Sequence, residues 1–205
     1  VSNADSAVII VALGTNYQLQ SSVFTQTIPS KKLEGFPHPH QKVTKIIEAA
    51  SKKSTTVLFQ NHLKDYQKYF SRVQLNLAAK QPSIPTDSLL ANYKKGIIDH
   101  YLEELYFQYG RYLLISSSRK GTLPSNLQGI WSQYDVSPWT SGYWHNVNVQ
   151  MNYWPVFNTN LAEMFASYVD YNKAFRAAAF LNGSNYIKKL NPAAFDSTKD
   201  ANGWA

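Results

Sequence analysis

Apolar residues recur at helical spacing along much of this 205-residue chain, and this periodicity restricts its fold more than any other feature. The pattern is clear within residues 41–79, where a Ser-Thr-Thr sequence at 54–56 interrupts it. Four residues of this segment follow the i, i+3, i+4, i+7 rule and so lie on one helical face: Val43, Ile46, Ile47 and Ala50. The segment therefore predicts helices.

A second long helix is predicted over residues 86–118, with Thr86 or Asp87 as its N-cap, because a short side-chain oxygen can accept from the first-turn N–H groups. Five residues on one face of this helix form a stripe that we expect in the core: Ile97, Tyr101, Leu105, Tyr109 and Tyr112. These positions favour a mostly α-helical fold.

Beyond this helix, residues 119–145 carry glycines and prolines with few periodic apolar positions, and they predict a long loop. Loops of this length in compact domains are usually functional. Residues 146–160 and 161–181 then predict a helix pair, and the chain after Asn182 is polar and rich in turn-forming residues.

One strand is expected, over Ala7–Leu13, where an apolar run ends at Gly14. A lone strand is not stable by itself, so we expect it to complete a sheet that precedes residue 1. The run is too short to span a bilayer, and no basic residues precede it as they would in a signal peptide. The chain begins at Val1 and ends at Ala205 without a capping pattern, so we expect a piece of a longer protein.

Charge and cysteine content exclude several functions. The net charge of +7 comes mostly from residues 1–100, which carry 12 Lys and Arg against 6 Asp and Glu. The aromatic residues that nucleic-acid binding would need lie in the other half, so no nucleic-acid partner is expected. Cysteine is absent, which excludes disulfides, a thiol nucleophile and a thiolate metal site. The His-Pro-His sequence at 38–40 predicts a loop, because no third metal ligand is near it.

Aromatic residues and neutral amides alternate in the window that spans residues 126–154. Seven aromatic residues lie there: Trp131, Tyr134, Trp139, Tyr143, Trp144, Tyr153 and Trp154. Amides accompany them, among them Asn126, Gln128, Asn146, Asn148, Gln150 and Asn152. Aromatic rings pack on the C–H face of a sugar, and amides both donate to and accept from its hydroxyls. The window is therefore compatible with a sugar site, and equally with an aromatic core whose amides cap loop backbone.

Asn146, Asn148 and Gln150 alternate with valines, which predicts an extended segment with the three amides on one side. Two such amides could hold a water or a sugar hydroxyl between them. An amide is too weak a base to deprotonate water, so a carboxylate would have to act behind it. Asp135 is the only acid between residues 105 and 162, so this segment supplies no such carboxylate.

Two longer strings stand out in this part of the chain, Leu123–Trp131 (LPSNLQGIW) and Asn146–Pro155 (NVNVQMNYWP). Through these strings the chain resembles glycoside hydrolase family 95, a family of α-L-fucosidases with some α-L-galactosidases. Further strings agree in the same order over most of residues 55–165: His62–Tyr66, Phe70–Leu75, Pro85–Asp87, Leu102–Arg111 and Asn160–Glu163.

The resemblance implies an architecture of a β-sandwich, a helical linker, an (α/α)6 barrel and a small C-terminal β domain. Residues 1–20 would then be the last strand of the N-terminal β-sandwich, and residues 21–85 the helical linker. Residues 86–205 would form the first helices of the catalytic barrel, which this chain would contain in truncated form.

The resemblance also implies inverting hydrolysis of a terminal α-linked L-fucose, in particular a 1,2-linked one. Asn148 matches the asparagine that positions the attacking water, and Asn146 matches its companion. The polarising aspartate and the general-acid glutamate would lie beyond residue 205. Substrate contacts are expected from five residues of the two strings and the segment before the second: Asn126, Gln128, Trp131, Trp144 and His145. Neither a metal nor a cofactor is expected.

One departure concerns the sugar itself. The family carries a histidine two residues before the first paired asparagine, and this chain has Trp144 there, with His145 one residue later. Because that position senses the substituent at C6 of the sugar, an α-L-galactosidase is an alternative. A carbohydrate-binding protein without catalysis is another. The expected partners are fucosylated or related L-sugar glycans and the remainder of the parent polypeptide, with no membrane span, in an extracellular or periplasmic bacterial location.

Overall fold

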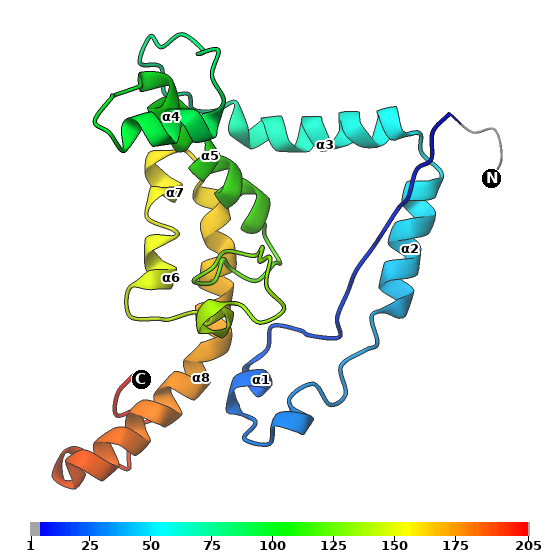
Figure 1. Cartoon of the computed structure of the whole chain (residues 1–205). Helices are drawn as coiled ribbons and strands as arrows, with labels where there is room; N and C mark the ends of the chain where they lie inside the picture. The colour runs from blue at the N-terminus through cyan, green and yellow to red at the C-terminus, as the bar shows by residue number, and fades with distance from the viewer. Residues whose placement is uncertain (1–4, 205) are drawn as a thin grey trace. The chain divides into compact units, whose positions relative to one another are not determined.

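The computed structural model describes residues 5–204, in which helices are the regular structure (Figure 1). Within this range the only β-type pairing outside regular strands is an isolated bridge between Asn126 and Gly129. The α-helices are α1 (Ser21–Thr25), α2 (His40–Ser51), α3 (Thr55–Phe70), α4 (Thr86–Tyr93), α5 (His100–Ser117), α6 (Asn148–Met151), α7 (Pro155–Asn158) and α8 (Phe165–Leu190). Short 3₁₀ turns are η1 (Pro29–Lys31), η2 (Pro138–Ser141), η3 (Ala162–Met164) and η4 (Pro192–Ala194). The mostly α-helical prediction is confirmed.

The chain forms two compact units. The first unit comprises Val1–Leu63 and Val169–Ala205, and the second unit comprises Lys64–Tyr168. The limits of these units fall inside α3 and α8. The predicted domain limits at residues 20 and 85 rest on the family resemblance and stay a prediction.

The helices expected within residues 41–79 are present as α2 and α3. The break between them covers residues 52–54, so it shares only Ser54 with the predicted Ser-Thr-Thr sequence. Ser54 ends the break, because its hydroxyl accepts from the Val57 N–H at 3.3 Å and its carbonyl accepts from the Leu58 N–H at 3.0 Å. These bonds satisfy N–H groups that the first turn of α3 would otherwise leave without a partner.

The prediction of a single helix over residues 86–118 is wrong, because two helices occupy the segment. Gly96 adopts a φ of +84° between them, a left-handed conformation that glycine adopts without steric cost. Asp99 then caps α5, with its carboxylate accepting from the Leu102 N–H at 2.9 Å. The predicted cap of α4 is also wrong: Pro85 holds the N-cap position, and the Asp87 carboxylate accepts only from the adjacent Ser88 N–H.

The stripe of five residues that was expected in the core, from Ile97 to Tyr112, lies largely at the surface. Ile97, Tyr109 and Tyr112 are 57%, 55% and 41% exposed. The buried face of α5 is a different one, made by Leu102, Arg111, Leu114, Ile115 and Ser117. Spacing alone could not separate the two faces, because α5 carries large apolar residues on both.

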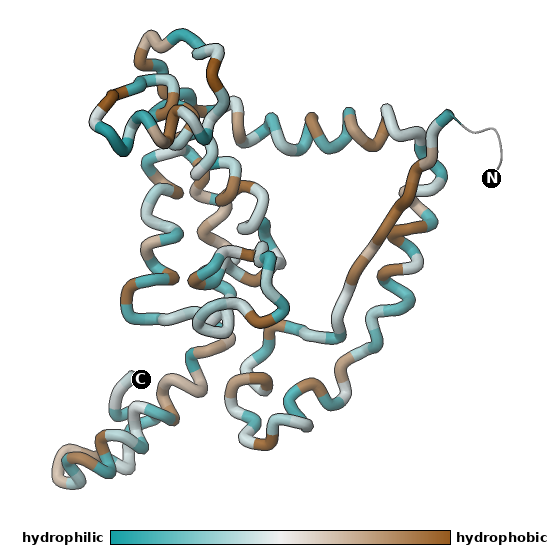
Figure 2. Tube along the Cα trace, viewed as in Figure 1, coloured by the Kyte–Doolittle hydropathy of each residue, from teal (hydrophilic) through white to brown (hydrophobic). Residues whose placement is uncertain are grey.

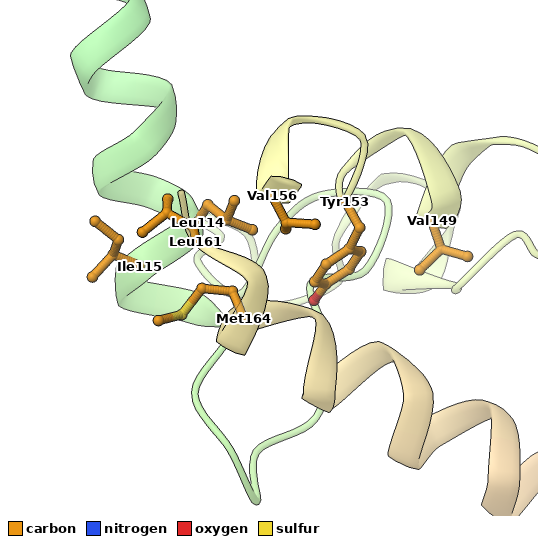
Figure 3. Packing of buried hydrophobic residues seen from close by; sticks show 7 residues of the cluster. All are labelled: Leu114, Ile115, Val149, Tyr153, Val156, Leu161 and Met164. Carbon is orange, nitrogen blue, oxygen red and sulfur yellow. The ribbon is translucent and has the colours of Figure 1, made fainter. Parts of the chain in front are cut away.

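The core of the second unit joins α5 to α6, α7 and η3 (Figure 3). It consists of Leu114, Ile115, Val149, Tyr153, Val156, Leu161 and Met164. Burying a side chain of this size stabilises a fold by roughly 1.5–3 kcal/mol. This cluster therefore fixes the segment 146–164 against the C-terminal half of α5.

The predicted helix pair over residues 146–181 takes a different form. Pro155 begins α7 and separates it from α6, and Asn160 adopts a φ of 54° that ends α7. The longer helix, α8, then continues to Leu190, so the prediction of a turn-rich tail after Asn182 is wrong up to that residue. No proline interrupts the sequence between 165 and 190, and the helix ends just before Pro192.

In the first unit, α8 packs through aromatic side chains. The Phe24 ring meets the edges of Tyr171 and Phe175, each at a centroid distance of 5.5 Å. Burial raises the pKa of the Tyr171 hydroxyl to about 12. Gly183 lets the chain near Trp204 approach α8 closely, since a Cβ on Gly183 would lie 2.6 Å from the Trp204 backbone nitrogen.

The strand expected over Ala7–Leu13 is not observed. Strand structure requires a hydrogen-bonding neighbour, and the segment pairs with nothing in residues 5–204. Figure 2 shows this part of the chain as a continuous hydrophobic run. Ile9 and Leu13 are 86% and 90% exposed.

Across the described chain, none of the helices combines the length and the apolar character that crossing a bilayer requires.

Candidate functional site

The residues predicted from the sequence lie on two segments of the second unit: the loop at 123–131, and the turn at 144–152 that leads into α6. A cavity of about 830 Å³ lies against the first of these segments. Two of the predicted residues, Gln128 and Trp131, line it. Other lining residues come from α5, α6 and α7 and include Glu103, Tyr106, Phe107, Arg111, Ser117, Met151 and Pro155. Ser125, from the loop, and Asn152, directly after α6, line it as well. The remaining predicted residues do not line this cavity.

The loop at 123–131 is shaped by Asn126. Its side-chain oxygen accepts from the Gln128 N–H at 2.8 Å, and its carbonyl accepts from the Gly129 N–H at 3.0 Å. Gly129 has a φ of +77°, which this tight turn requires. The Asn126 side-chain oxygen therefore accepts within the loop itself, and Asn126 does not line the cavity. Its contact with sugar stays a prediction.

Asn146 and Asn148 are exposed, and neither side chain hydrogen-bonds to another residue in the described part of the chain. The prediction that Asn146, Asn148 and Gln150 share one side of an extended segment is wrong. Asn148 begins α6, Val149 is fully buried, and the Gln150 amide turns back to donate to the His145 carbonyl. The two asparagines are therefore polar groups available to a ligand.

Trp144 and His145 differ in environment. Trp144 is 49% exposed and adopts a left-handed φ of 44°. Its indole packs on Gly142, where an added Cβ would lie 2.8 Å from Nε1. His145 is half-buried, and burial lowers the pKa of its imidazole below the ordinary value. The His145 ring is therefore neutral at pH 7.

Glu103 is the only carboxylate that lines the cavity. Hydrogen bonds from His100, at 2.8 Å, and from the Tyr93 hydroxyl, at 2.9 Å, hold the pKa of the Glu103 carboxyl below its ordinary value. An ionised carboxylate accepts hydrogen bonds from hydroxyls but cannot donate a proton. The cavity thus offers groups that can bind a polyhydroxylated ligand.

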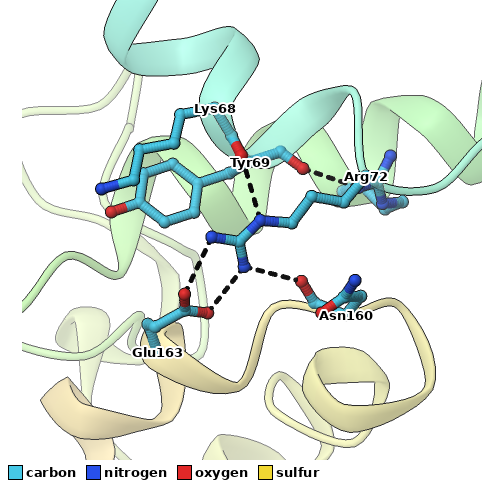
Figure 4. Close-up of polar contacts among 6 residues, drawn as sticks. Lys68, Tyr69, Arg72, Asn160 and Glu163 are labelled. Carbon is cyan, nitrogen blue, oxygen red and sulfur yellow. Dashed lines mark hydrogen bonds and ion pairs between the residues drawn. The ribbon is translucent and has the colours of Figure 1, made fainter.

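Glu163 is committed to a structural ion pair (Figure 4). Arg72 binds both of its carboxylate oxygens at 2.9 Å and donates to the Asn160 carbonyl at 3.1 Å. The hydrogen bonds from Arg72 lower the pKa of the Glu163 carboxyl. The Arg72 guanidinium also lies 4.8 Å from the centroid of the Tyr69 ring. This pairing anchors the end of α3 to the turn between α7 and α8.

Sequence reasoning missed one group beneath the loop, the buried hydroxyl of Tyr153. It bonds to the Ser125 N–H and to the Ser118 hydroxyl, both at 2.8 Å. The partners lie 28 and 35 positions away in the chain, so no local pattern could identify them. The available signal was the position of Tyr153 in the aromatic window, which does not indicate these partners.

Groups of three or more side chains suited to hold a metal ion are not found among the described residues.

Comparison with known proteins agrees with the two strings that border the site. The model of the glycosyl hydrolase family 95 catalytic domain matches residues 54–200. A relative from Aspergillus niger named "Probable alpha-fucosidase A" is 40% identical over 158 residues, covering 76% of this chain and 19% of the relative. "Alpha-L-fucosidase 2" of Arabidopsis thaliana is 38% identical over 180 residues, covering 85% of this chain and 20% of the relative. "Probable alpha-fucosidase A" of Aspergillus oryzae is 35% identical over 173 residues, covering 82% of this chain and 23% of the relative.

The chain thus spans about a fifth of the length of these curated relatives. The family model, in contrast, covers well over half of the chain, including the cavity, the loop and both exposed asparagines. The chain therefore belongs to glycoside hydrolase family 95, and it carries part of that family's catalytic domain.

Proposed function

We propose that the protein containing this chain removes terminal α-L-fucose from glycans by an inverting mechanism. Membership of the family and the printed names of three relatives support this substrate class. The structural observation that carries the proposal is the pair Asn146 and Asn148, two exposed carboxamides that hydrogen-bond to no other described residue. Polar side chains that the fold does not use are suited to bind water or sugar hydroxyls.

In an inverting hydrolase one group protonates the leaving oxygen while another activates water on the opposite face of the sugar. We assign the water to Asn148, with Asn146 as its companion. A carboxamide can orient a water through its oxygen, but it cannot take the proton, so an ionised aspartate must polarise it. Following the family resemblance, we assign that aspartate and the general-acid glutamate to positions beyond residue 205. Within this chain, Glu163 is paired with Arg72.

The substrate contacts proposed from the sequence rest on unequal support. Gln128 and Trp131 line the cavity, which offers an amide and an aromatic ring to a sugar. Trp144 is exposed on the segment that leads to the paired asparagines. Asn126 acts through its loop, and His145 is held by burial beside the Gln150 amide.

The architecture belongs to the same proposal. Residues 86–205 would be the first helices of an (α/α)6 barrel, residues 21–85 a helical linker, and residues 1–20 the last strand of a β-sandwich. The helical second unit supports the barrel assignment. The exposed apolar run at 7–13 supports the strand, because such a segment needs a neighbouring strand to cover it. A secreted or periplasmic location in a bacterium completes the proposal.

The test replaces Asn148 in the full-length protein. Asn148→Ala should lower kcat on a 1,2-linked α-L-fucoside by about 10²–10³-fold, as loss of one preorganised polar group does in other hydrolases. The melting temperature should not change, since the side chain is exposed and forms no bond in the fold. Asn158→Ala is the matched control, an exposed asparagine in α7 of the same unit, and it should retain full activity.

Proton NMR of the same reaction tests the stereochemistry. β-L-Fucose should appear first if the reaction inverts. Retention of activity by Asn148→Ala would contradict the assigned role. A full-length protein that binds the oligosaccharide but releases no sugar would favour a carbohydrate-binding function without catalysis.

An α-L-galactosidase of the same family is the second candidate, and Trp144 is the observation that favours it. Its exposed indole stands where the family carries a histidine. The ratio of kcat/KM for the α-L-fucoside to that for the α-L-galactoside decides between the two. Trp144→His should raise this ratio if the position reads the substituent at C6.

A further inference from the structure

Two consecutive residues at the end of α6 hold two consecutive residues of the loop at 123–131. The Tyr153 hydroxyl accepts from the Ser125 N–H at 2.8 Å. The Asn152 side-chain amide donates to the Asn126 carbonyl at 3.0 Å and to the Ser125 carbonyl at 3.4 Å. Tyr153 therefore supplies an acceptor to the loop, and its neighbour Asn152 supplies a donor. We call this four-residue contact the clamp.

The hydrogen-bonding capacity of the Tyr153 hydroxyl is fully used. The Ser167 hydroxyl lies 3.3 Å from it and the Ser118 hydroxyl 2.8 Å, and in each of these two contacts either oxygen can donate. Together with the bond from the Ser125 N–H, the phenolic oxygen has three partners, which is its full complement.

The Tyr153 ring is fixed by packing. Its side chain is only 2% exposed, and it stacks on Tyr168 at a centroid distance of 5.4 Å and 29° between the planes. Phe165 contacts it edge-on at 6.2 Å. Figure 3 shows the ring inside the core cluster, with its hydroxyl pointing away from Val156. A ring held on several sides gives its oxygen one position, and the Ser125 N–H is fixed with it.

The clamp lies directly beneath the cavity. Ser125 and Asn152 line the cavity, as does Gln128, which follows in the same loop. Tyr153 does not line it. The Ser125 hydroxyl adds a third attachment by donating to the Ser117 hydroxyl at 2.7 Å, at the C-terminal end of α5. Movement of Ser125 would therefore carry Gln128 with it, because Asn126 joins the two through its bond to the Gln128 N–H.

We propose that Tyr153 is a positioning residue for the carbohydrate site: its hydroxyl fixes the turn at Ser125–Gly129, and through that turn it places Gln128 for the substrate. The proposal rests on the proposed function, since it names a determinant of substrate binding at the same site. It assigns Tyr153 no contact with the sugar. Its effect is expressed in substrate affinity, through Gln128.

The decisive variant is Tyr153→Phe in the full-length protein, because it removes one oxygen and keeps the ring. It leaves the buried Ser125 N–H without its acceptor, and the loop then moves to find another. On an α-L-fucoside we expect kcat/KM to fall at least tenfold, mostly through KM. Ile115→Ala is the control, since it removes fully buried contacts from the same core and touches none of the hydroxyls. It should lower the melting temperature and leave KM within twofold.

A double variant separates positioning from general loss of structure. If Tyr153 acts through Gln128, then Tyr153→Phe should change KM less than threefold in a Gln128→Ala background. Independent, multiplicative effects of the two substitutions on KM would overturn the proposal. So would a KM for Tyr153→Phe that matches the Ile115→Ala control.

Hydrogen exchange gives a readout that does not depend on turnover. The Ser125 amide should exchange at least tenfold faster in Tyr153→Phe than in Ile115→Ala, and equal exchange would overturn the clamp. A wild-type protein that releases no L-sugar would contradict the proposed function instead. The exchange of the Ser125 amide would then still decide whether Tyr153 fixes the loop.

Discussion

Among single residues, His145 links the candidate site to pH. Its imidazole is half-buried, and burial disfavours the charged form, so its pKa in the folded protein lies below the ordinary value of 6.5. The unfolded chain therefore takes up a proton at a higher pH than the folded chain does. His100 titrates in the opposite sense, because Glu103 raises its pKa. The two histidines act on stability with opposite signs.

The lowered pKa of His145 predicts how the stability of the protein depends on pH. The stabilising contribution of the neutral imidazole is fully present above pH 6.5 and is lost as the pH falls through the lower folded pKa. The free energy of unfolding, measured by urea titration between pH 7.5 and 5, should thus decrease more steeply in the wild-type protein than in His145→Gln. His100→Gln serves as the comparison and should change the slope in the other direction. Parallel curves for the wild-type protein and His145→Gln would contradict the burial argument.

Among the elements, the start of α5 depends on one carboxylate. Asp99 accepts from the Leu102 N–H, and its negative charge lies at the positive end of an 18-residue helix. Asp87 occupies the first turn of α4, but it bonds only to the adjacent Ser88 N–H. The two aspartates therefore differ in what they contribute, although both stand near a helix start.

Asp99→Ala should lower the free energy of unfolding by about 1 kcal/mol, the usual effect of losing an N-cap side chain. Asp87→Ala is the matched variant and should cost less than about 0.5 kcal/mol. Guanidinium titration of both variants gives the comparison. Equal losses would show that the Asp99 side chain does not cap α5.

The elements that the sequence predicted correctly are those fixed by interactions between residues close together in the chain. The break between α2 and α3 was predicted because Ser54 caps locally. The break before α5 was missed because it depends on the left-handed conformation of Gly96, which residue type permits but does not require. At the site, Gln128 and Trp131 were expected from the family resemblance of one short string, and both line the cavity. The role of Tyr153 could not be predicted in this way, because its hydrogen-bond partners come from three separate segments of the chain.

At the scale of the molecule, Arg111 connects two helices of the second unit, α5 and α3. This side chain is 2% exposed, extends from α5, and donates to the carbonyls of Tyr69 and Phe70 at 3.1 and 2.9 Å. A further bond goes to the carbonyl of Val73. Burial lowers the pKa of its guanidinium, while the negative end of the α3 dipole favours the cation. The C-terminal end of α3 is thereby held to the middle of α5.

Arg111→Lys keeps the charge and should still destabilise the protein. An ammonium group cannot spread its donors over the same carbonyls from one position, so several remain without a partner. We expect a loss of about 2–4 kcal/mol in the free energy of unfolding, since hydrogen bonds to charged groups are worth about 1.5–3 kcal/mol each. Arg176→Lys, at an exposed position of α8, should change stability by less than about 0.5 kcal/mol. Urea titration of both variants measures the difference.

The ion pair between Arg72 and Glu163 can form only late in the synthesis of the second unit. The two residues are 91 positions apart. Ribosomes add about 5–20 residues per second, so Glu163 is made roughly 5–18 s after Arg72. During that interval the Arg72 guanidinium has neither the carboxylate nor the Asn160 carbonyl that binds it in the fold. The contact that anchors the end of α3 therefore forms only after the turn between α7 and α8 has left the ribosome.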